Sequence, residues 1–500
     1  MKKTRPLFIF IFIIALIAVW LGATAWIGAR IEPEMRGYFA RLARLNGLQE
    51  DAFHVERVQH TFFTSKMRVT QRAAAPISGL PRSVDLAIEH GPIFWRRGAG
   101  LGLARIHAHL SLAAQTDRGH SGEGNASTIS AEMVARVGWD RQVHLRADVE
   151  PFVWPIDEGA VGGGTPVEAL LWSDPATVQS VFDPYTFAGK YRIDTPRLGV
   201  RDRSGATLLE AETVALSGSV VSVASDWFTG EATATMGRVR GLVVGTDANG
   251  TAGWPDLTLE LALQTTAQSR TKVGWRYRVR FAVLAGALPA PMAPVRSGTI
   301  RVEMSGLVRS GIASLMQAIR RAQQQQAQLT QTLQTSSDDP SRVAEALVTA
   351  QTLPATLKRQ VLLTLPAILE RNATRLQIQA TLATRTHPDN TVEATLLYTG
   401  ALPTANVEAM AAALAHPVPA LFTMDARAAF GTTLVQELGG EQGKRYAAAL
   451  AAIARQGWLK RTGDRYSLSI HYDPRHLILN GRSMPMILMG LKLIQQGGAF

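Results

Sequence analysis

The first group of residues able to do chemistry in this sequence is His90-Gly91-Pro92, which follows a segment of alternating apolar residues. A histidine at the end of a strand can act as a base or bind a metal, because it titrates near neutral pH. A glycine followed by a proline also enforces a turn, in which the imidazole can bond a backbone carbonyl. We predict the second, structural role for His90, Gly91 and Pro92.

A second candidate is the pair His107 and His109, two residues apart in another alternating segment. In a strand this spacing places both imidazoles on one face, which would allow them to share a zinc ion. Zinc needs a third protein ligand, for which His120 and Glu123 are the nearest candidates. We expect instead a solvent-facing strand, and we assign no metal ligand, no cofactor-binding residue and no catalytic residue.

Arg276, Arg278 and Arg280 form a third group, with apolar residues between them. On a strand they would make a ladder of positive charge on one face. A solvated sheet face is the plainer interpretation. The sharper hypothesis is a face that binds phosphate or carboxylate, such as a lipid head group or an acidic saccharide. We keep the three arginines as a candidate anion-binding face.

Other kinds of reactive site are missing from the sequence. It contains no cysteine, which excludes disulfides, thiol nucleophiles and cysteine-bound metals. It has neither the phosphate-binding pattern Gly-x-x-x-x-Gly-Lys-Ser/Thr nor the nucleophile elbow Gly-x-Ser-x-Gly. We therefore expect a protein that is not an enzyme.

The chain is organised around one uncharged stretch of 22 residues, Leu7–Gly28. At about 1.5 Å per residue, a helix of this length spans a hydrocarbon core of roughly 30 Å. Lys2, Lys3 and Arg5 precede it, which favours a cytoplasmic N-terminus. We predict a single-pass anchor in a bacterial inner membrane, with most of the chain in the periplasm. A signal peptide cleaved at Ala23-Thr24-Ala25 is the competing interpretation.

Composition agrees with a large folded protein outside the cytoplasm. Hydrophobic residues make up 46% of the chain, which is ample for a core, and the net charge is +12. A basic balance suits nucleic acid, anionic lipid or an acidic polymer. A periplasmic location removes nucleic acid from these partners and leaves the membrane surface or a phosphorylated glycolipid.

The segments after the anchor predict a β-rich α+β protein. Region 31–50 has apolar residues at helical spacing and predicts an amphipathic helix that begins near Pro33, packed on the following domain or lying on the bilayer. Region 51–307 alternates with period 2, as in half-buried antiparallel strands that form long curved sheets, closed or open.

Helices follow the strands in the second half of the sequence. Region 308–372 predicts a long helix, then one helix after Pro340 and another after Pro354. Region 373–500 predicts further strands, helices near 404–415 and 427–456, and a closing hairpin. The apolar segment Met484–Ile494 is expected to dock on the sheet or on a partner.

Several short stretches together resemble the YdgA-like family of Gram-negative envelope proteins. They are Trp26–Glu32, Thr61–Met67, His90-Gly91-Pro92, and Tyr466–Leu479 with Asn480-Gly481 after it. Their order along the chain carries the resemblance, because each motif alone is short. The resemblance implies an inner-membrane protein with a large periplasmic part that self-associates. It implies no catalytic residues, because the function of that family is unknown.

Three functions of different classes follow from these observations. The lack of a catalytic constellation favours a non-enzymatic envelope scaffold or assembly factor, acting as a single chain or as a homo-oligomer. An apolar sheet trough would favour a module that binds lipid or glycolipid. A pocket converging on His90, or on His107 and His109, would favour a histidine-dependent hydrolase. We predict the scaffold, in contact with membrane lipid through residues 7–28.

Overall fold

The structure is a computed structural model, and it describes most of the chain. The described residues are 5–45, 49–72, 83–94, 100–113, 128–156, 169–202, 205–223, 227–241, 255–288, 292–335, 340–400, 402, 408, 421–473 and 476–484. Within these ranges, the side chains of residues 5–19, of Ser222 and Val223, and of parts of the later helices are not described. The chain divides into two units, Met1–Ser225 and Asp226–Phe500, and the division falls inside the predicted region 51–307.

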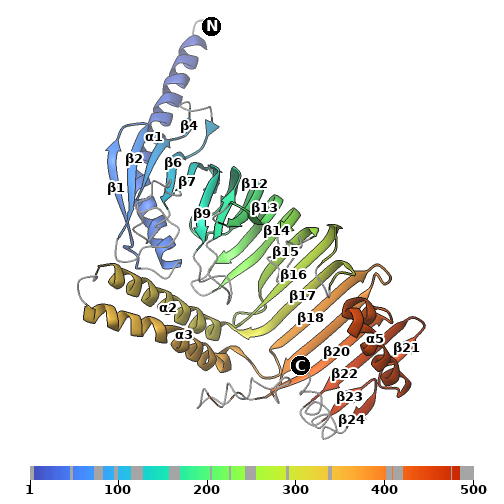
Figure 1. The fold of residues 1–500 in the computed structure, drawn as a ribbon. Coiled ribbons are helices and arrows are strands. Elements are labelled where there is room, and N and C mark those ends of the chain that lie inside the picture. The colour runs from blue at the N-terminus through green and yellow to red at the C-terminus, as the bar shows by residue number, and fades with distance from the viewer. Residues whose placement is uncertain are drawn as a thin grey trace. The chain divides into compact units, whose positions relative to one another are not determined.

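The described part of unit 1 consists of one helix, an antiparallel sheet and a separate two-stranded sheet of β4 and β5 (Figure 1). Its elements are α1 (Arg5–Leu45), β1 (Phe53–His60), β2 (Thr64–Gln71), β3 (Ser83–His90), β4 (Ile93–Phe94), β5 (Gly100–Leu101), β6 (Ala104–Ala113), β7 (Thr128–Val137), β8 (Val143–Val149), β9 (Phe152–Ile156), β10 (Ala169–Ser173), β11 (Ala176–Phe182), β12 (Gly189–Asp202) and β13 (Thr207–Val223). The strands pair in the order β1-β2-β3-β6-β7-β8-β11-β12-β13. In addition, β10 pairs with β12, and β9 pairs with β10. Among the described strands β1 pairs only with β2, so the sheet is open at that edge.

Unit 2 also contains one antiparallel sheet. Its elements are β14 (Phe228–Gly241), β15 (Asp256–Ala267), β16 (Lys272–Ala285), β17 (Val295–Val308), α2 (Arg309–Thr335), α3 (Pro340–Ile368), β18 (Arg375–Thr384), β19 (Asn390–Tyr398), β20 (Phe422–Gly431), α5 (Leu434–Arg455), β21 (Lys460–Thr462), β22 (Arg465–Tyr472), β23 (Leu477–Leu479) and β24 (Arg482–Met484). The strands pair in the order β14 to β20 and then β22, with β21 and β23 along β22. The expected β-rich antiparallel fold is confirmed.

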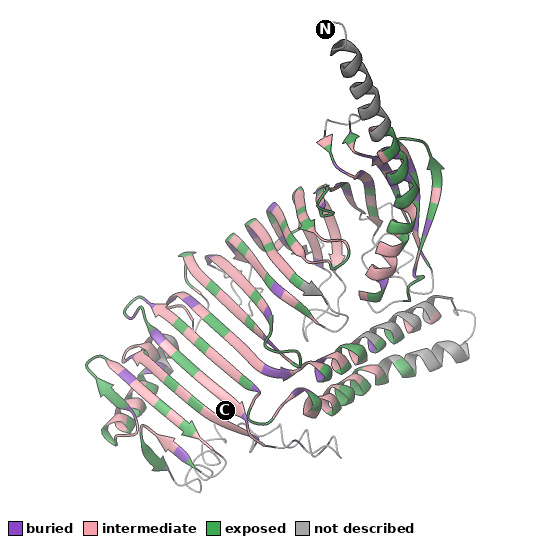
Figure 2. Cartoon of the chain, turned by 180° about the vertical axis from the view of Figure 1, so that it is seen from behind, coloured by how far each residue is buried: buried purple, intermediate pink, exposed green. Residues whose placement is uncertain are grey.

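Alternation along the sequence becomes two different faces of the unit 2 sheet. Leu261 of β15 lies opposite Val279 of β16, which lies opposite Ile300 of β17, so apolar side chains form rows across the strands. Directly opposite residues share a face because the side chains of a strand alternate with period 2. Figure 2 shows the matching alternation of exposed and partly buried residues along these strands.

The helical hairpin of α2 and α3 is attached to the end of β17. Val273, Leu307, Ile312 and Ile368 are buried in one cluster there. Gly306 has a φ of +71°, and an added Cβ would lie 2.2 Å from the carbonyl oxygen of Ala373. Only glycine fits this close approach. The predicted packing of helices in the C-terminal part of the chain is therefore found.

The N-terminal helix differs from the expectation. A separate amphipathic helix was expected to begin near Pro33, but α1 is one continuous helix with Pro33 inside it. An interior proline costs about 3 kcal/mol. Ile31 and Met35, on either side of Pro33, pack on the sheet and offset this cost. Of the two placements considered for region 31–50, the structure has the one packed on the following domain.

The predicted membrane segment, Leu7–Gly28, lies mostly outside the residues whose side chains are described. Within the part of the chain that the structure does describe, no helix is both long enough and apolar enough to cross a membrane.

Two further expectations in the C-terminal half are corrected. The break predicted at Pro354 is absent, because α3 runs through it to Ile368. Residues 427–431 were expected to be helical, but they end strand β20, where Arg427 pairs with Glu393 of β19 and Ser469 of β22. Pairing on both sides outweighs the helical preference of this alanine-rich segment. Apart from Glu408, which is helical, the predicted helix at 404–415 lies outside the described residues, as does the segment after Met484.

Candidate functional site

One face of the unit 1 sheet is apolar across successive strands. Leu86 of β3, Ala108 of β6 and Met133 of β7 lie opposite one another in a row. A neighbouring row consists of Ile88, Ile106, Ala135 and Leu145. These rows share a face because directly paired residues point the same way. They form an apolar floor that reaches from β3 to β8.

Helix α1 lies on this floor with its apolar side. The apolar residues facing the sheet recur every three or four positions, which places them on one side of a helix; they are Ile27, Ile31, Met35, Phe39 and Leu42. Ile27 and Ile31 are buried against β1, β2 and β3. The helix covers only part of the floor, so an open cleft remains beside it.

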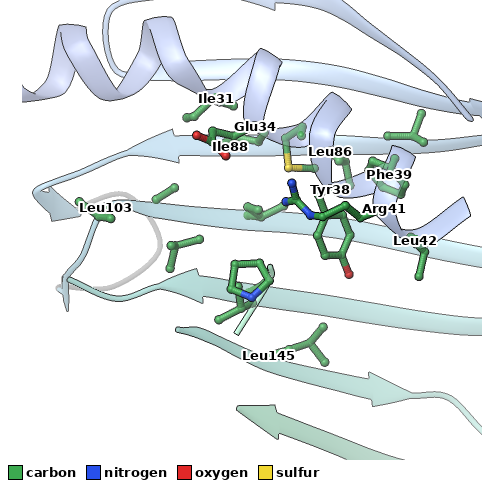
Figure 3. A pocket seen from close by; sticks show the side chains of 18 of the residues that line it. Ile31, Glu34, Tyr38, Phe39, Arg41, Leu42, Leu86, Ile88, Leu103 and Leu145 are labelled. Carbon is green, nitrogen blue, oxygen red and sulfur yellow. The ribbon is translucent and has the colours of Figure 1, made fainter. Parts of the chain in front are cut away.

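The cleft between α1 and the sheet has a volume of about 480 Å³, within the range of roughly 300–1,000 Å³ typical of small-molecule sites. Its lining is mainly aliphatic and aromatic. Figure 3 shows Leu86, Ile88 and Leu145 on the strands below α1, and Leu103 just before β6. Phe182, Pro184 and Tyr185, at and after the end of β11, also line the cleft. The shape and lining suit a hydrocarbon ligand.

The charged groups of the cleft are Arg30, Glu34, Arg41 and Arg141. The hydroxyl of Tyr185 donates a hydrogen bond of 3.1 Å to Oε2 of Glu34. The guanidinium carbon of Arg41 lies 4.8 Å from the centre of the Tyr185 ring. Two of these groups, Glu34 and Arg41, therefore contact one tyrosine.

Two tyrosines of the cleft have raised pKa values. Burial raises the pKa of Tyr38, while the charge of Arg41 acts in the opposite direction. Burial also raises the pKa of Tyr185, as do the charge and hydrogen bond of Glu34, while Arg141 and Arg41 lower it. Both phenols are therefore neutral at physiological pH. The Tyr38 hydroxyl can donate a hydrogen bond to a ligand, whereas the Tyr185 hydroxyl donates to Glu34.

The predicted turn His90-Gly91-Pro92 lies against the middle of α1. The hydroxyl of Thr24 donates to the carbonyl oxygen of Gly91 at 2.8 Å. Gly28 approaches the imidazole so closely that an added Cβ would lie 2.7 Å from Nδ1 of His90. The Gly91-Pro92 bond is cis. The structure thus places the three residues at the docking point of α1, outside the cleft lining.

His90 takes part in a small polar cluster between β1, β2 and β3. Its Nδ1 lies 3.2 Å from the carbonyl oxygen of Phe62, which can only accept, so Nδ1 carries the proton. Its Nε2 then accepts from the Ser65 hydroxyl at 3.0 Å. Nδ1 of His60 donates to the same Ser65 oxygen at 2.9 Å. Every nitrogen of the buried imidazole is satisfied, which fits a structural histidine.

His107 and His109 lie on β6 with their side chains on the sheet face opposite α1. His107 is paired with Val134 and His109 with Glu132 of β7. Within the described residues no group of three metal-binding side chains occurs. His120 and Glu123, the suggested third ligands, lie outside the described residues.

The arginine ladder of β16 faces carboxylates on both neighbouring strands. Nε of Arg276 lies 2.7 Å from Glu303 of β17, and Nη2 of Arg278 lies 2.6 Å from Glu260 of β15. Arg280 reaches the second oxygen of Glu260 at 3.3 Å. Two carboxylates thus neutralise most of the charge of three arginines. The anion-binding face stays a prediction, and an anion would have to compete with these partners.

Sequence reasoning did not find the cleft. The spacing of Met35, Tyr38, Phe39 and Leu42 indicated a helix with an apolar side. It could not show which strands that side faces or that part of the floor stays open. The only sequence feature among these residues that could have indicated a binding site was the presence of Tyr38 and Arg41 beside the apolar residues of this helix.

The fold and cleft define a β-rich protein whose N-terminal helix lies on an antiparallel sheet and leaves an apolar cavity beside it. Residues 1–486 match the family of bacterial proteins of unknown function called DUF945. The chain belongs to this family, in agreement with the expectation of an uncharacterised bacterial family. No curated protein and no solved structure matches it.

Proposed function

We propose that the protein binds the hydrocarbon chain of a lipid or glycolipid in the cleft between α1 and the unit 1 sheet. The observation that carries this proposal is a cavity of about 480 Å³ with an apolar floor and an apolar helix wall. Transfer of apolar surface out of water is favourable by about 25 cal/mol per Å². A bound hydrocarbon chain would cover the apolar rows that α1 leaves open.

The proposal includes the predicted membrane anchor. The backbone of α1 is continuous from Arg5 to the cleft wall. If the N-terminal part of Leu7–Gly28 lies in a bacterial inner membrane, the cleft residues of α1, which begin at Trp26, lie near the membrane surface. The hydrocarbon chain of a lipid could then pass from the bilayer into the cleft without crossing bulk water. A periplasmic location and membership of the YdgA-like group are parts of this proposal.

The other two predicted functions have less support from the site. A histidine-dependent hydrolase would need His90 in a pocket, but His90 is buried and does not line the cleft. The envelope scaffold, alone or as a homo-oligomer, stays a prediction, and no described feature identifies its partner.

The test fills the cleft with a larger side chain. Full-length protein would be held in amphipol, since detergent would compete for the site, and titrated with hexadecanol while bound chain is counted by native mass spectrometry. Leu145 is half-buried in the cleft floor on β8. We expect Leu145→Trp to weaken binding by at least about tenfold, because it occupies the volume of several methylenes worth about 0.8 kcal/mol each.

The matched control is Val134→Trp, on the opposite face of the same sheet, where Val134 is 39% exposed. This variant should bind hexadecanol as the natural protein does. Far-ultraviolet circular dichroism and thermal unfolding would check that both variants are folded. Unchanged binding by a folded Leu145→Trp protein would refute the proposal.

A further inference from the structure

Arg41 differs from most arginines of unit 1 in its partners. The described arginines of unit 1 with carboxylate partners are Arg36, Arg44, Arg57, Arg68, Arg72, Arg105, Arg146, Arg192 and Arg197. Arg41 instead faces the ring of Tyr185, and its buried Nε has no hydrogen-bond partner within the described residues. A buried donor without a partner costs free energy, so the Arg41 guanidinium is less fully paired than those that face a carboxylate.

The described lining of the cleft carries a net positive charge. Its charged residues are Arg30, Arg41 and Arg141 with one carboxylate, Glu34. Glu34 accepts from Tyr185, so Tyr185 holds this carboxylate beside the cations. Figure 3 shows the side chains of Arg41 and Tyr38 extending from α1 into the cleft, above the apolar strands. A positive group at the side of an apolar cavity is complementary to an amphiphile with an anionic head.

We propose that the ligand of the cleft is an anionic amphiphile, whose carboxylate or phosphate oxygens are bound by Arg41 with Arg141 beside it. This inference rests on the proposed function, because it assumes that the hydrocarbon chain occupies the apolar floor. It adds the chemical class of the head group. The guanidinium of Arg41 supplies planar donors for two oxygens, and the Tyr38 hydroxyl supplies a further neutral donor.

The experiment compares four probes in amphipol-held full-length protein. They are palmitate, palmitoyl lysophosphatidate, hexadecanol and inorganic phosphate, so that the head group and the chain vary separately. We expect Arg41→Gln to weaken the binding of palmitate and lysophosphatidate by about tenfold or more, which is the usual loss for a charge-assisted hydrogen bond. The affinity for hexadecanol should be unchanged. Inorganic phosphate alone should bind at least about a hundredfold more weakly, since it lacks the chain.

The variant Glu34→Gln is expected to strengthen the binding of the anionic probes, whereas Arg41→Gln weakens it. The glutamine oxygen still accepts from Tyr185, but one negative charge beside the head group is removed. Affinity for the two anionic probes should therefore rise, while affinity for hexadecanol stays the same. Arg36→Gln is the control, because Arg36 lies on the same helix, pairs with Glu32 and does not line the cleft.

The outcomes separate this inference from the proposed function. If Arg41→Gln weakens the binding of palmitate, lysophosphatidate and hexadecanol equally, or weakens the binding of none of them, the head-group assignment is wrong. Binding of inorganic phosphate as tightly as lysophosphatidate would also overturn it. If Leu145→Trp leaves hexadecanol binding intact, the proposed function itself fails. Loss of chain binding in Leu145→Trp without head-group selectivity at Arg41 would refute the inference alone.

Discussion

The hydroxyl of Thr24 donates a hydrogen bond of 2.8 Å to the carbonyl oxygen of Gly91, 67 residues further along the chain. Both groups are buried, and Thr24 is 0% exposed. The same hydroxyl lies 2.8 Å from the carbonyl oxygen of Trp20, one helical turn earlier. This contact joins α1 to the turn after β3 and, together with Gly28, determines where the helix crosses the sheet.

Thr24→Val removes this hydrogen bond while nearly preserving the shape of the side chain. A buried acceptor left without a partner costs about 1–3 kcal/mol. We expect the amides of residues 24–45 to exchange with deuterium at least about tenfold faster, measured by mass spectrometry on the full-length protein. Thr24→Ser, which keeps the hydroxyl, should exchange nearly as slowly as the natural protein. Equal exchange in both variants would show that the contact does not hold the helix.

Two glycines of α1 give a matched pair for testing helix docking. A Cβ at Gly28 would lie 2.7 Å from Nδ1 of His90, whereas a Cβ at Gly22 would meet nothing within 4 Å. Gly28→Ala should lower the free energy of unfolding of unit 1 by about 1–3 kcal/mol, as in overpacked cores. Gly22→Ala should be neutral or stabilising by up to about 1 kcal/mol, because alanine favours helix. Thermal unfolding of the two variants would rank them, and the reverse order would contradict the docking geometry.

His90 makes the stability of unit 1 sensitive to acid. Burial lowers its pKa below the ordinary value of 6.5; the bond to Phe62 raises it, while the charges of His60 and Arg57 lower it. Below pH 6.5 the unfolded chain binds a proton that the folded state does not. Stability therefore falls as the pH drops from 6.5 to the lowered pKa.

Urea unfolding at pH 7.5, 6.5 and 5.5 would measure this effect. His90→Gln should be less stable than the natural protein at pH 7.5 and should lose part of the decline at lower pH. His54→Gln serves as the control, since His54 is exposed on β1 and its replacement leaves the cluster of His60, Ser65 and His90 in place. If natural protein and His90→Gln decline in parallel, His90 does not contribute to the acid sensitivity.

Glu260→Gln tests the arginine ladder of unit 2. Glu260 is the partner of both Arg278 and Arg280, so the variant leaves two guanidiniums without their carboxylate. If the ladder binds anions, affinity for vesicles containing phosphatidylglycerol should increase severalfold at low salt and decrease at high salt. Exposed ion pairs contribute about 0–1 kcal/mol, so the fold should tolerate the change. Unchanged vesicle binding would indicate that the ladder is only a solvated sheet face.

Retention of the N-terminal helix can be tested by the mass of the intact protein purified from bacterial membranes. Cleavage after Ala25 would remove Thr24 and with it the bond to Gly91. We therefore expect the full-length mass. An N-terminus at Trp26 would show that the segment acts as a cleaved signal peptide, and the proposed passage of lipid from an attached bilayer would then be wrong.

The sequence by itself determined the secondary structure wherever local pattern and local chemistry agree. The alternation of Leu257, Leu259, Leu261 and Leu263 with polar residues predicted β15, because only a strand places these leucines on one face. Asn480-Gly481 predicted the turn before β24, and both residues have positive φ there, 47° and 80°. The long helix predicted after Val308 is α2.

Only the tertiary structure decided what these elements face. Whether Pro33 starts a helix or lies inside one depends on the packing of Ile31 and Met35 against strands far along the chain. The partners of Arg278 depend on the register of β15 against β16. The cleft exists because α1 covers only some of the apolar rows, and its size depends on the distances between the helix and the strands. Local sequence patterns do not determine these distances, because they report only the conformation of neighbouring residues.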